Sequence, residues 1–188
     1  MMYRERIFVN NFTKTNFERS RDLTAKCIPY LKQMLGGEFV HTEQCNRQSF
    51  AVTLDVDYGI DLLWVKNGKA YTIGVRTSND YYPYFTISCD NYNGTPAEYN
   101  EIKTSFLAPI YIFKISFENE VPMNLYIAKA DELVDYIDTH RPKKYDSPRS
   151  RHYYYAIPIT SYKNVQTYDG KTAYFFREYN FSDYELKG

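Results

Sequence analysis

The sequence has no excess charge of either sign, few cysteines and no long hydrophobic run. Each absence excludes some classes of protein. Its 23 Lys and Arg balance 23 Asp and Glu, so any nucleic-acid surface must be a local patch. The cysteines Cys27, Cys45 and Cys89 lie far apart without the spacing of zinc ligands, which predicts reduced, mostly buried thiols. No run approaches the ~18 apolar residues of a membrane span, and the N-terminal residues lack the apolar segment of a signal peptide. We therefore expect a soluble cytoplasmic protein with no membrane partner.

Histidine is also scarce, whereas tyrosine is abundant. The scattered His41, His140 and His152 form no triad or metal-ligand pattern and are interpreted as surface residues. The 21 Tyr and 12 Phe make the chain 18% aromatic. Tyrosine packs with its ring and bonds with its hydroxyl, so it suits both interfaces and nucleobase stacking. Compositional bias of an A+T-rich genome explains the same content equally well.

The order of expected elements predicts an α/β fold of the mixed α+β kind, with a central mixed sheet flanked by helices. Asn67-Gly68 is the strongest hairpin signal in the chain. The near-continuous apolar run at 109–116 is typical of a strand buried on both faces. The expected sheet strands are 60–65, 70–77, 84–88 and 109–116, and the expected helices lie near 16–35 (with a kink or break at Pro29), 96–106 (capped by Thr95) and 130–140.

The composition changes after residue 140. The segment 141–155 holds five Lys and Arg against one Asp, with two prolines, which predicts an exposed basic loop. Asp169-Gly170 predicts a C-terminal β-hairpin. We expect residues 1–140 to form the core, and residues 141–188 to form a basic loop and hairpin extension packed on the same domain. The candidate nucleic-acid or partner-binding residues are Arg141, Lys143, Lys144, Arg149, Arg151, Tyr153 and Tyr154. The alternative is that this loop is merely solvated.

The hairpin "GIDLLWVKNGKAYTIGVRTS", residues 59–78, carries Asp61 near its start and Arg76 near its end. Together with the preceding helix and the following helix and apolar strand, it resembles the PD-(D/E)XK nuclease superfamily, which includes many restriction enzymes and archaeal Holliday-junction resolvases. The resemblance covers roughly residues 15 to 138 and implies a restriction-endonuclease-like core. It implies that Asp61 is the motif aspartate, that Gly74-Val75-Arg76 is the D/E-x-K triplet, and that Glu18 is the glutamate often supplied by the first helix.

The chemistry of such sites shows what this chain has lost. Phosphodiester hydrolysis uses a divalent cation held by carboxylates. A strand places residues 74 and 76 on the same face, but Gly74 supplies no ligand and only the Val75 carbonyl, also a ligand in this family, remains. Arg76 keeps the positive charge and can clamp a phosphate, but a guanidinium does not shuttle protons. The resemblance therefore implies vestigial catalytic positions at Asp61, Arg76 and Glu18, with weak or no metal binding at Asp61.

Two simpler explanations stand beside this one. Thr15 and Glu18 fit a capping box at a helix start, which would account for Glu18 completely. Arg76 and Asp61 could form a plain cross-strand ion pair. Gly74 needs a reason in either case, because glycine weakens strands.

The leading functional hypothesis is a catalytically degenerate nuclease-like protein that binds DNA, a nucleic-acid-processing enzyme, or both. By analogy, phage and mobile elements encode inhibitors of defence nucleases of the anti-CRISPR or anti-restriction type. The first alternative is an active Mg²⁺-dependent DNA endonuclease whose missing carboxylate comes from Glu98, Glu101, Asp55 or Asp57. The second is a non-enzymatic regulatory interaction domain. No cofactor is expected unless the chain is active, and a homodimer is left open.

Overall fold

The hairpin predicted at Asn67-Gly68 forms the centre of the larger sheet. Asn67 and Gly68 have φ values of 52° and 73°, the left-handed conformations that a two-residue turn between twisted strands requires. The turn joins β2 (Leu62–Lys66) to β3 (Lys69–Ser78), which pair antiparallel with Lys66 opposite Lys69. The sequence signal for this hairpin is confirmed.

The computed structural model describes residues 2–42, 54, 59–78, 82–95, 97–148, 151–165 and 174–184, and the side chains of this set from residue 18 onward. Its larger sheet has six strands in the order β1-β2-β3-β5-β6-β9. The remaining strands of this sheet are β1 (Glu38–His41), β5 (Tyr111–Glu118), β6 (Val121–Lys129) and β9 (Phe176–Asn180). The smaller sheet has the order β4-β8-β7, from β4 (Tyr84–Asn91), β8 (His152–Pro158) and β7 (Lys144–Ser147). The helices are α1 (Met2–Leu35), α3 (Glu98–Thr104), α4 (Ala130–His140), α5 (Ile159–Lys163) and the short 3₁₀ helix η2 (Phe181–Asp183).

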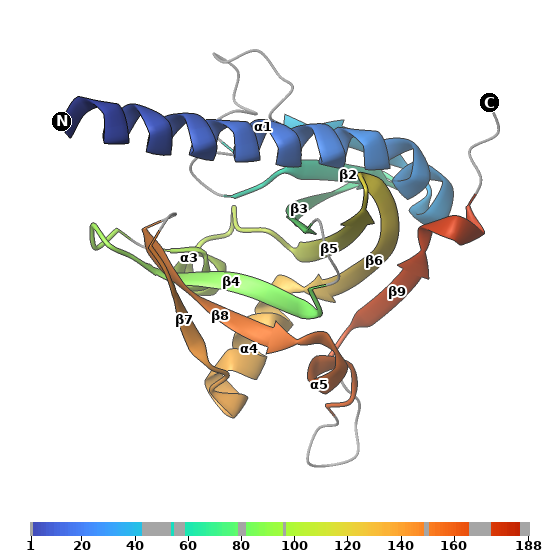
Figure 1. Ribbon diagram of the computed structural model, residues 1–188. Coiled ribbons are helices and arrows are strands. Elements are labelled where there is room, and N and C mark those ends of the chain that lie inside the picture. The colour runs from blue at the N-terminus through green and yellow to red at the C-terminus, as the bar shows by residue number, and fades with distance from the viewer. Residues whose placement is uncertain are drawn as a thin grey trace.

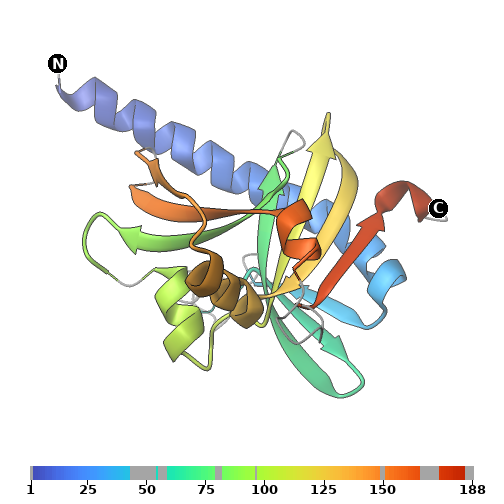
Figure 2. The same cartoon turned by 90° about the horizontal axis from the view of Figure 1, so that it is seen from below.

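These elements form layers around the six-stranded sheet. Helix α1 lies across one face of this sheet, while the three-stranded sheet with α4 lies on the other side (Figures 1 and 2). The α1 side contains an apolar core in which Leu31 of α1 packs with Phe113 and Ile115 of β5. A second core joins Ile112 of β5 to the smaller sheet and to α4. Strand β5 is therefore buried on both faces, as its apolar sequence predicted.

The connection from β3 to β5 makes the sheet mixed. β3 and β5 are parallel, with Arg76 beside Lys114 in the register, whereas β1, β2 and β3 pair antiparallel with one another. A parallel pair needs a crossover, and the chain supplies one through β4 and α3. The mixed α+β class is confirmed, and so are the predicted strands near 60–65, 70–77 and 109–116 and the helix at 130–140.

The placement of residues 84–88 in the central sheet is wrong. They belong to β4, which pairs with β8 and forms the smaller sheet, with Ile87 opposite Tyr155. The alternating pattern predicted a strand but carried no information about which sheet would receive it, since pairing partners are chosen by tertiary packing.

One prediction for the C-terminal third is also wrong. The basic segment is not an irregular loop, because β7 and β8 pair as an antiparallel hairpin with Tyr145 opposite Tyr154. The described residues around the expected C-terminal hairpin form α5 and β9, and β9 pairs with β6 in the larger sheet. The turn proposed at residues 169–170 lies outside the described residues. Residues after 140 thus contribute strands to both sheets.

The helix boundaries correct several local expectations. Helix α1 contains Pro29 without being split, although its last turns bend downward in Figure 1. It begins at Met2, so Glu18 lies in its interior and does not close a capping box with Thr15. Helix α3 begins at Glu98 after Ala97, and Thr95 hydrogen-bonds within its own loop, so its predicted role as N-cap is wrong. Cys27 and Cys89 are buried free thiols as predicted, and Cys45 lies outside the described residues.

Within the described part of the chain, none of the helices combines the length and apolar character needed to cross a membrane.

Candidate functional site

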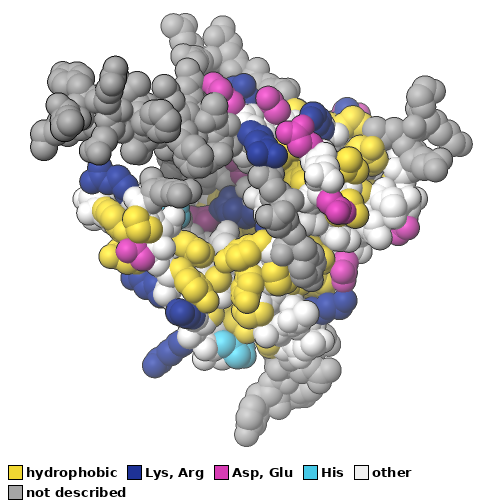
Figure 3. All heavy atoms as spheres, viewed as in Figure 1, with side chains coloured by type: hydrophobic (Ala, Val, Ile, Leu, Met, Phe, Trp, Pro, Cys, Tyr) yellow, Lys and Arg dark blue, Asp and Glu magenta, His cyan; other side chains and the backbone are white. Residues whose placement is uncertain are grey.

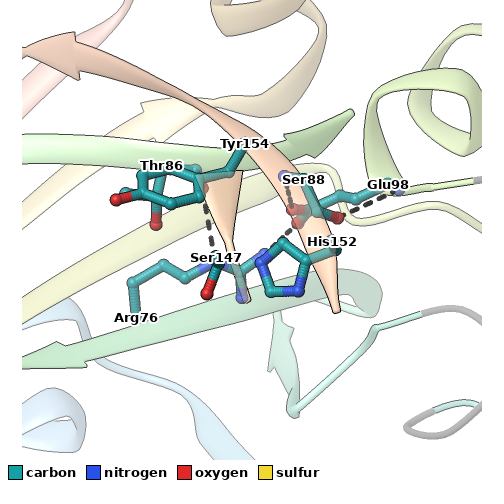
Figure 4. Close-up of a pocket in the computed structure, with 7 residues that line it drawn as sticks. All are labelled: Arg76, Thr86, Ser88, Glu98, Ser147, His152 and Tyr154. Atoms are coloured by element: carbon teal, nitrogen blue, oxygen red, sulfur yellow. Dashed lines mark hydrogen bonds and ion pairs between the residues drawn. The ribbon is translucent and has the colours of Figure 1, made fainter. Parts of the chain in front are cut away.

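A cleft of about 430 Å³ opens where the two sheets diverge. Its lining comes from five elements that are far apart in the sequence, which is the usual position for a functional site between packed layers. The lining residues are Arg76 of β3, Thr86 and Ser88 of β4, Glu98 of α3, Ser147 of β7, and His152 and Tyr154 of β8 (Figure 4).

The geometry of β2 and β3 places Asp61 beside Arg76. The Asp61 N–H donates to the Ile73 carbonyl and extends the ladder of the hairpin by one step. Residues alternate between the two faces of a strand, so Ile73 and Val75 face the α1 core while Gly74 and Arg76 face the cleft side with Asp61. An Asp61 carboxylate oxygen accepts a hydrogen bond from the Val75 N–H, which fixes the carboxylate over the strand. The shared face predicted for residues 61 and 76 is confirmed.

The guanidinium of Arg76 is surrounded by oxygen atoms. It forms an ion pair with the Glu98 carboxylate and a longer one with Asp61, where Nη1 and Oδ2 are 3.8 Å apart. It also donates to the carbonyl of Val75 at 3.0 Å and to the carbonyl of Thr86 at 3.4 Å. Two carboxylates and the middle carbonyl of the triplet therefore bind this internal cation.

Glu98 is held in place by a reciprocal contact with Ser88. The Ser88 N–H donates to Glu98 Oε2 at 3.3 Å, and the Glu98 N–H donates to the Ser88 hydroxyl oxygen at 3.3 Å (Figure 4). The serine on β4 thus satisfies a free N–H at the start of α3, the role usually filled by a cap residue in sequence. This contact carries Glu98 into the cleft.

Charge pairing decides the protonation of Arg76. Burial of the guanidinium acts to lower its pKa, but the nearby Glu98 and Asp61 charges and the hydrogen bond to Glu98 outweigh burial and raise the pKa of Arg76. Arg76 is thus a permanent cation whose charge is largely neutralised by the Glu98 and Asp61 carboxylates. The phosphate clamp predicted for Arg76 would have to compete with both carboxylates.

The absence of a side chain at residue 74 has a structural reason. A Cβ at Gly74 would lie 3.1 Å from Ile112 Cδ1 and 3.3 Å from the Gly59 carbonyl oxygen. These distances are tighter than ordinary contact, and one of the neighbours is backbone. The close approach of the Gly59 segment therefore explains why residue 74 is a glycine. The same neighbours fill the space that a carboxylate side chain at this position of the triplet would need.

The described residues do not form a metal centre. No group of three or more His, Cys, Asp and Glu among them is placed to hold a metal ion, so Glu18 does not join Asp61 and Glu98 in such a group. Glu18 lies two residues before Ser20, whose hydroxyl is 2.9 Å from that of Thr77 on β3. Of the proposed replacement acids, only Glu98 lines the cleft, while Asp55 and Asp57 lie outside the described residues. The oxygen atoms suited to Mg²⁺ are present, but Arg76 binds them.

Lys114 is a second cation on this side of the sheet. Lys114 is only 3% exposed and lies beside Arg76 in the register of the parallel β3–β5 pair. Its Nζ lies 5.5 Å from the centre of the Tyr82 ring. Burial, and then the Arg76 charge, lower the pKa of Lys114 to about 8. A lysine inside the apolar run "YIFKISF" was a visible signal, which the continuous-strand interpretation passed over.

The predicted binding residues of the C-terminal segment lie around the β7–β8 hairpin, and of those described Tyr154 lines the cleft. Lys144 forms an ion pair with Asp90 and lies over the Tyr153 ring, and Lys143 lies over Tyr145. Tyr145 and Tyr154 stack across the hairpin with their centroids 5.6 Å apart. The exposed Arg141 ends α4, Arg151 follows the turn, and Arg149 lies outside the described residues.

The structure thus brings Tyr154 and Arg76 together in the cleft, with Asp61 paired to Arg76. In the space-filling view, acidic and basic side chains meet in a recess beside a patch of the hydrophobic class, which includes tyrosine (Figure 3). Sequence reasoning missed Thr86, Ser88 and Ser147, because single hydroxyl residues in strands carry no signal of a site. It also interpreted His41 as a surface residue, although His41 is only 5% exposed, and it did not assign His152 to the cleft that His152 lines.

These features define a mixed α+β protein with a salt-bridged cleft between two sheets. No protein-family model, curated protein or solved structure matches this chain, so its family is not identified by comparison.

Proposed function

We propose that this chain is a catalytically degenerate nuclease-like protein that acts by binding nucleic acid or an enzyme that processes it. The observation that carries the proposal is the position of the Arg76 guanidinium. It binds Asp61, Glu98 and the Val75 carbonyl, the oxygen groups that would otherwise be candidates for a divalent cation. A permanent internal cation satisfies these oxygens without offering a water molecule for attack.

The order and pairing of the elements support the resemblance to the PD-(D/E)XK superfamily. A long helix is followed by three antiparallel strands, a helix and a strand parallel to the third, with Asp61 at the start of the second strand. Strand β4 is then an insertion between the third strand and α3. Fold resemblance alone does not imply activity, and the site decides between cutting and binding.

The β7–β8 hairpin supplies the binding half of the proposal. It presents lysines over tyrosine rings beside the cleft, a combination suited to contacting phosphates and stacking on unpaired bases. The chain is neutral overall, so a local basic and aromatic surface is the form that such binding would take.

The test combines metal binding, cleavage and DNA binding on the same preparation. Calorimetry should detect no stoichiometric Mg²⁺ or Mn²⁺ binding to the wild-type chain, and supercoiled, linear and branched DNA should remain uncut. DNA binding, or inhibition of a restriction or CRISPR nuclease, should be measurable and salt-dependent. An uncut substrate together with no binding and no inhibition would leave only a purely regulatory domain and overturn the proposal.

Glu98 favours a second candidate function, the active Mg²⁺-dependent endonuclease with a relocated carboxylate. Glu98 comes from α3 and shares the Arg76 guanidinium with Asp61, so the two acids lie on the same side of the sheet. If the guanidinium turned away, these acids and the Val75 carbonyl would provide oxygen ligands. Metal-dependent cleavage that disappears in both Asp61→Asn and Glu98→Gln would establish this candidate in place of the first.

A further inference from the structure

Lys114 occupies a position that packing does not explain. Its strand neighbours Phe113 and Ile115 face the α1 core, whereas Lys114 faces the other side with Arg76. Tyr126 lies opposite Lys114 on β6, and Tyr82 covers the end of its side chain. Among the described residues, none forms a hydrogen bond or an ion pair with the Lys114 ammonium group. Its neighbour across the strand pair is another cation, Arg76, whose own charge is paired with two acids.

A buried amine with no acidic partner in the described part of the chain is costly to stability, and this cost indicates a role. Tyr82 connects this amine to the cleft. The Tyr82 side chain hydrogen-bonds with Tyr154, which lines the cleft. Tyr82 is 37% exposed and belongs to neither hydrophobic core, so its ring can turn aside without opening one.

We propose that the space between Arg76, Lys114 and Tyr82, behind the part of the cleft that Arg76 and Tyr154 line, is a subsite for the phosphate group of a nucleotide. This inference rests on the proposed nucleic-acid-binding function and names the chemical group that the cleft receives. Lys114 supplies the compensating positive charge that Arg76, neutralised by Glu98 and Asp61, does not. A lysine ammonium binds phosphate as a point charge with three donors.

The rest of the cleft fits the sugar and base of a single nucleotide. Its volume of about 430 Å³ lies within the range of small-molecule sites. The Thr86 and Ser88 hydroxyls face it from β4, and the Tyr154 ring and His152 face it from β8 (Figure 4). Hydroxyl groups suit the polar edges of a sugar or base, and aromatic rings suit the face of a base. A simple carboxylate ligand would leave these surfaces unused.

The experiment measures binding of four probes by calorimetry: inorganic phosphate, a nucleoside 5′-monophosphate, and a short single-stranded DNA with and without a 5′-phosphate. The variants are Lys114→Met, which keeps the length of the side chain without its charge, and Tyr154→Leu, which removes the ring. Lys69→Met is the matched control, because Lys69 is an exposed lysine at the β2–β3 turn, away from the cleft. Thermal unfolding of each variant confirms that it is folded.

Lys114→Met should weaken binding of every phosphate probe by about ten-fold or more, the loss expected for one charge-assisted hydrogen bond. Tyr154→Leu should weaken the nucleotide and the DNA but not inorganic phosphate, and Lys69→Met should match the wild type. Binding of the free monophosphate identifies a nucleotide site, and binding confined to DNA identifies a subsite for a strand.

Equal affinity of wild type and Lys114→Met for all four probes would overturn the subsite. If DNA still binds in that case, the proposed function stands and only the subsite fails. If the free nucleotide binds through Lys114 while neither DNA nor a nuclease does, the subsite stands and the proposed function fails.

Discussion

The two faces of the six-stranded sheet follow different physical rules. On the face covered by α1, apolar side chains of β3, β5 and β6 form a buried core with the helix. On the opposite face, the same strands carry Arg76 and Lys114 beneath the smaller sheet. Burial of apolar area explains the first face completely. The second face buries charge at a cost to stability, and proteins accept such costs mainly at functional sites.

The largest effect is expected on the α1 face. Phe113 is fully buried in the α1 core, so Phe113→Ala removes a large ring and leaves a cavity. The expected loss is about 3–5 kcal/mol in the free energy of unfolding, measured by urea denaturation. A loss below about 1 kcal/mol would mean that this face is not a close-packed core, and the contrast between the faces would disappear.

The adjacent residue should respond in the opposite direction. The pKa of Lys114 is lowered from 10.5 to about 8, so the folded protein gives up a proton that the unfolded chain keeps between those values. The contribution of Lys114 to stability should therefore rise with pH across that window, with its full penalty below about pH 8, while the raised pKa values of the Cys27 and Cys89 thiols act in the opposite direction. Lys114→Met should stabilise the protein at pH 7 by up to about 3 kcal/mol, and this advantage over the wild type should shrink as the pH rises to 10. The measurement is urea unfolding at pH 7, 8.5 and 10 for both proteins.

A destabilised Lys114→Met variant would contradict this expectation. It would indicate that the ammonium group is satisfied in the folded state, and the two faces would then differ less than their sequences indicate. The exposed-lysine variant Lys69→Met controls for the loss of one positive charge.

A smaller effect is expected where the charges of the cleft face are paired. Glu98→Gln leaves the partly buried Arg76 with Asp61, which is more distant, as its one acidic partner among the described residues, and should cost about 2 kcal/mol of unfolding free energy. Asp61→Asn should cost less, because the Asp61 carboxylate is 3.8 Å from the guanidinium and its amide replacement can still accept the Val75 N–H. Thermal unfolding of the two variants side by side gives the order. The reverse order would make Asp61 the main partner of Arg76.

The sequence predicted the strands of one face better than the charges of the other. The hairpin at Asn67-Gly68, the buried strand at 111–118 and the shared face of Asp61 and Arg76 follow from local rules: turn chemistry, apolar runs and the alternation of strands. For Glu98, the sequence offered only one of several candidate acids. Its position depends on a contact with Ser88, which joins two elements that no periodic pattern links.

The same limit explains the errors in strand pairing. Strand β4 was placed in the wrong sheet, and the pairing of β9 with β6 was not predicted, since both partners are decided by which surfaces remain to be covered. The reason for Gly74 was equally nonlocal, because the carbonyl that fills its space belongs to Gly59, fifteen residues earlier in the chain. Local chemistry thus fixes elements and faces, and the partners of each element require the fold.

The smallest effect on stability, and a large one on binding, is expected at the β7–β8 hairpin. Lys143 and Lys144 are exposed at the start of the β7–β8 hairpin, where they lie over Tyr145 and Tyr153. Reversing both charges, Lys143→Glu with Lys144→Glu, should change the free energy of unfolding by no more than about 0.5 kcal/mol, because surface substitutions rarely do more. If the hairpin contacts phosphates, the dependence of the DNA affinity on salt should lose up to about two units of slope.

A matched control reverses two exposed lysines elsewhere, Lys69→Glu with Lys163→Glu. Lys163 pairs with Glu178 as Lys144 pairs with Asp90, so both double variants break one surface ion pair and change the net charge equally. DNA binding that falls in the hairpin variant and not in the control would assign phosphate recognition to the hairpin. Equal behaviour of the two variants would show that the hairpin is a solvated edge. The sheet face that carries Arg76 and Lys114 would then remain as the candidate binding surface, because it buries two cations.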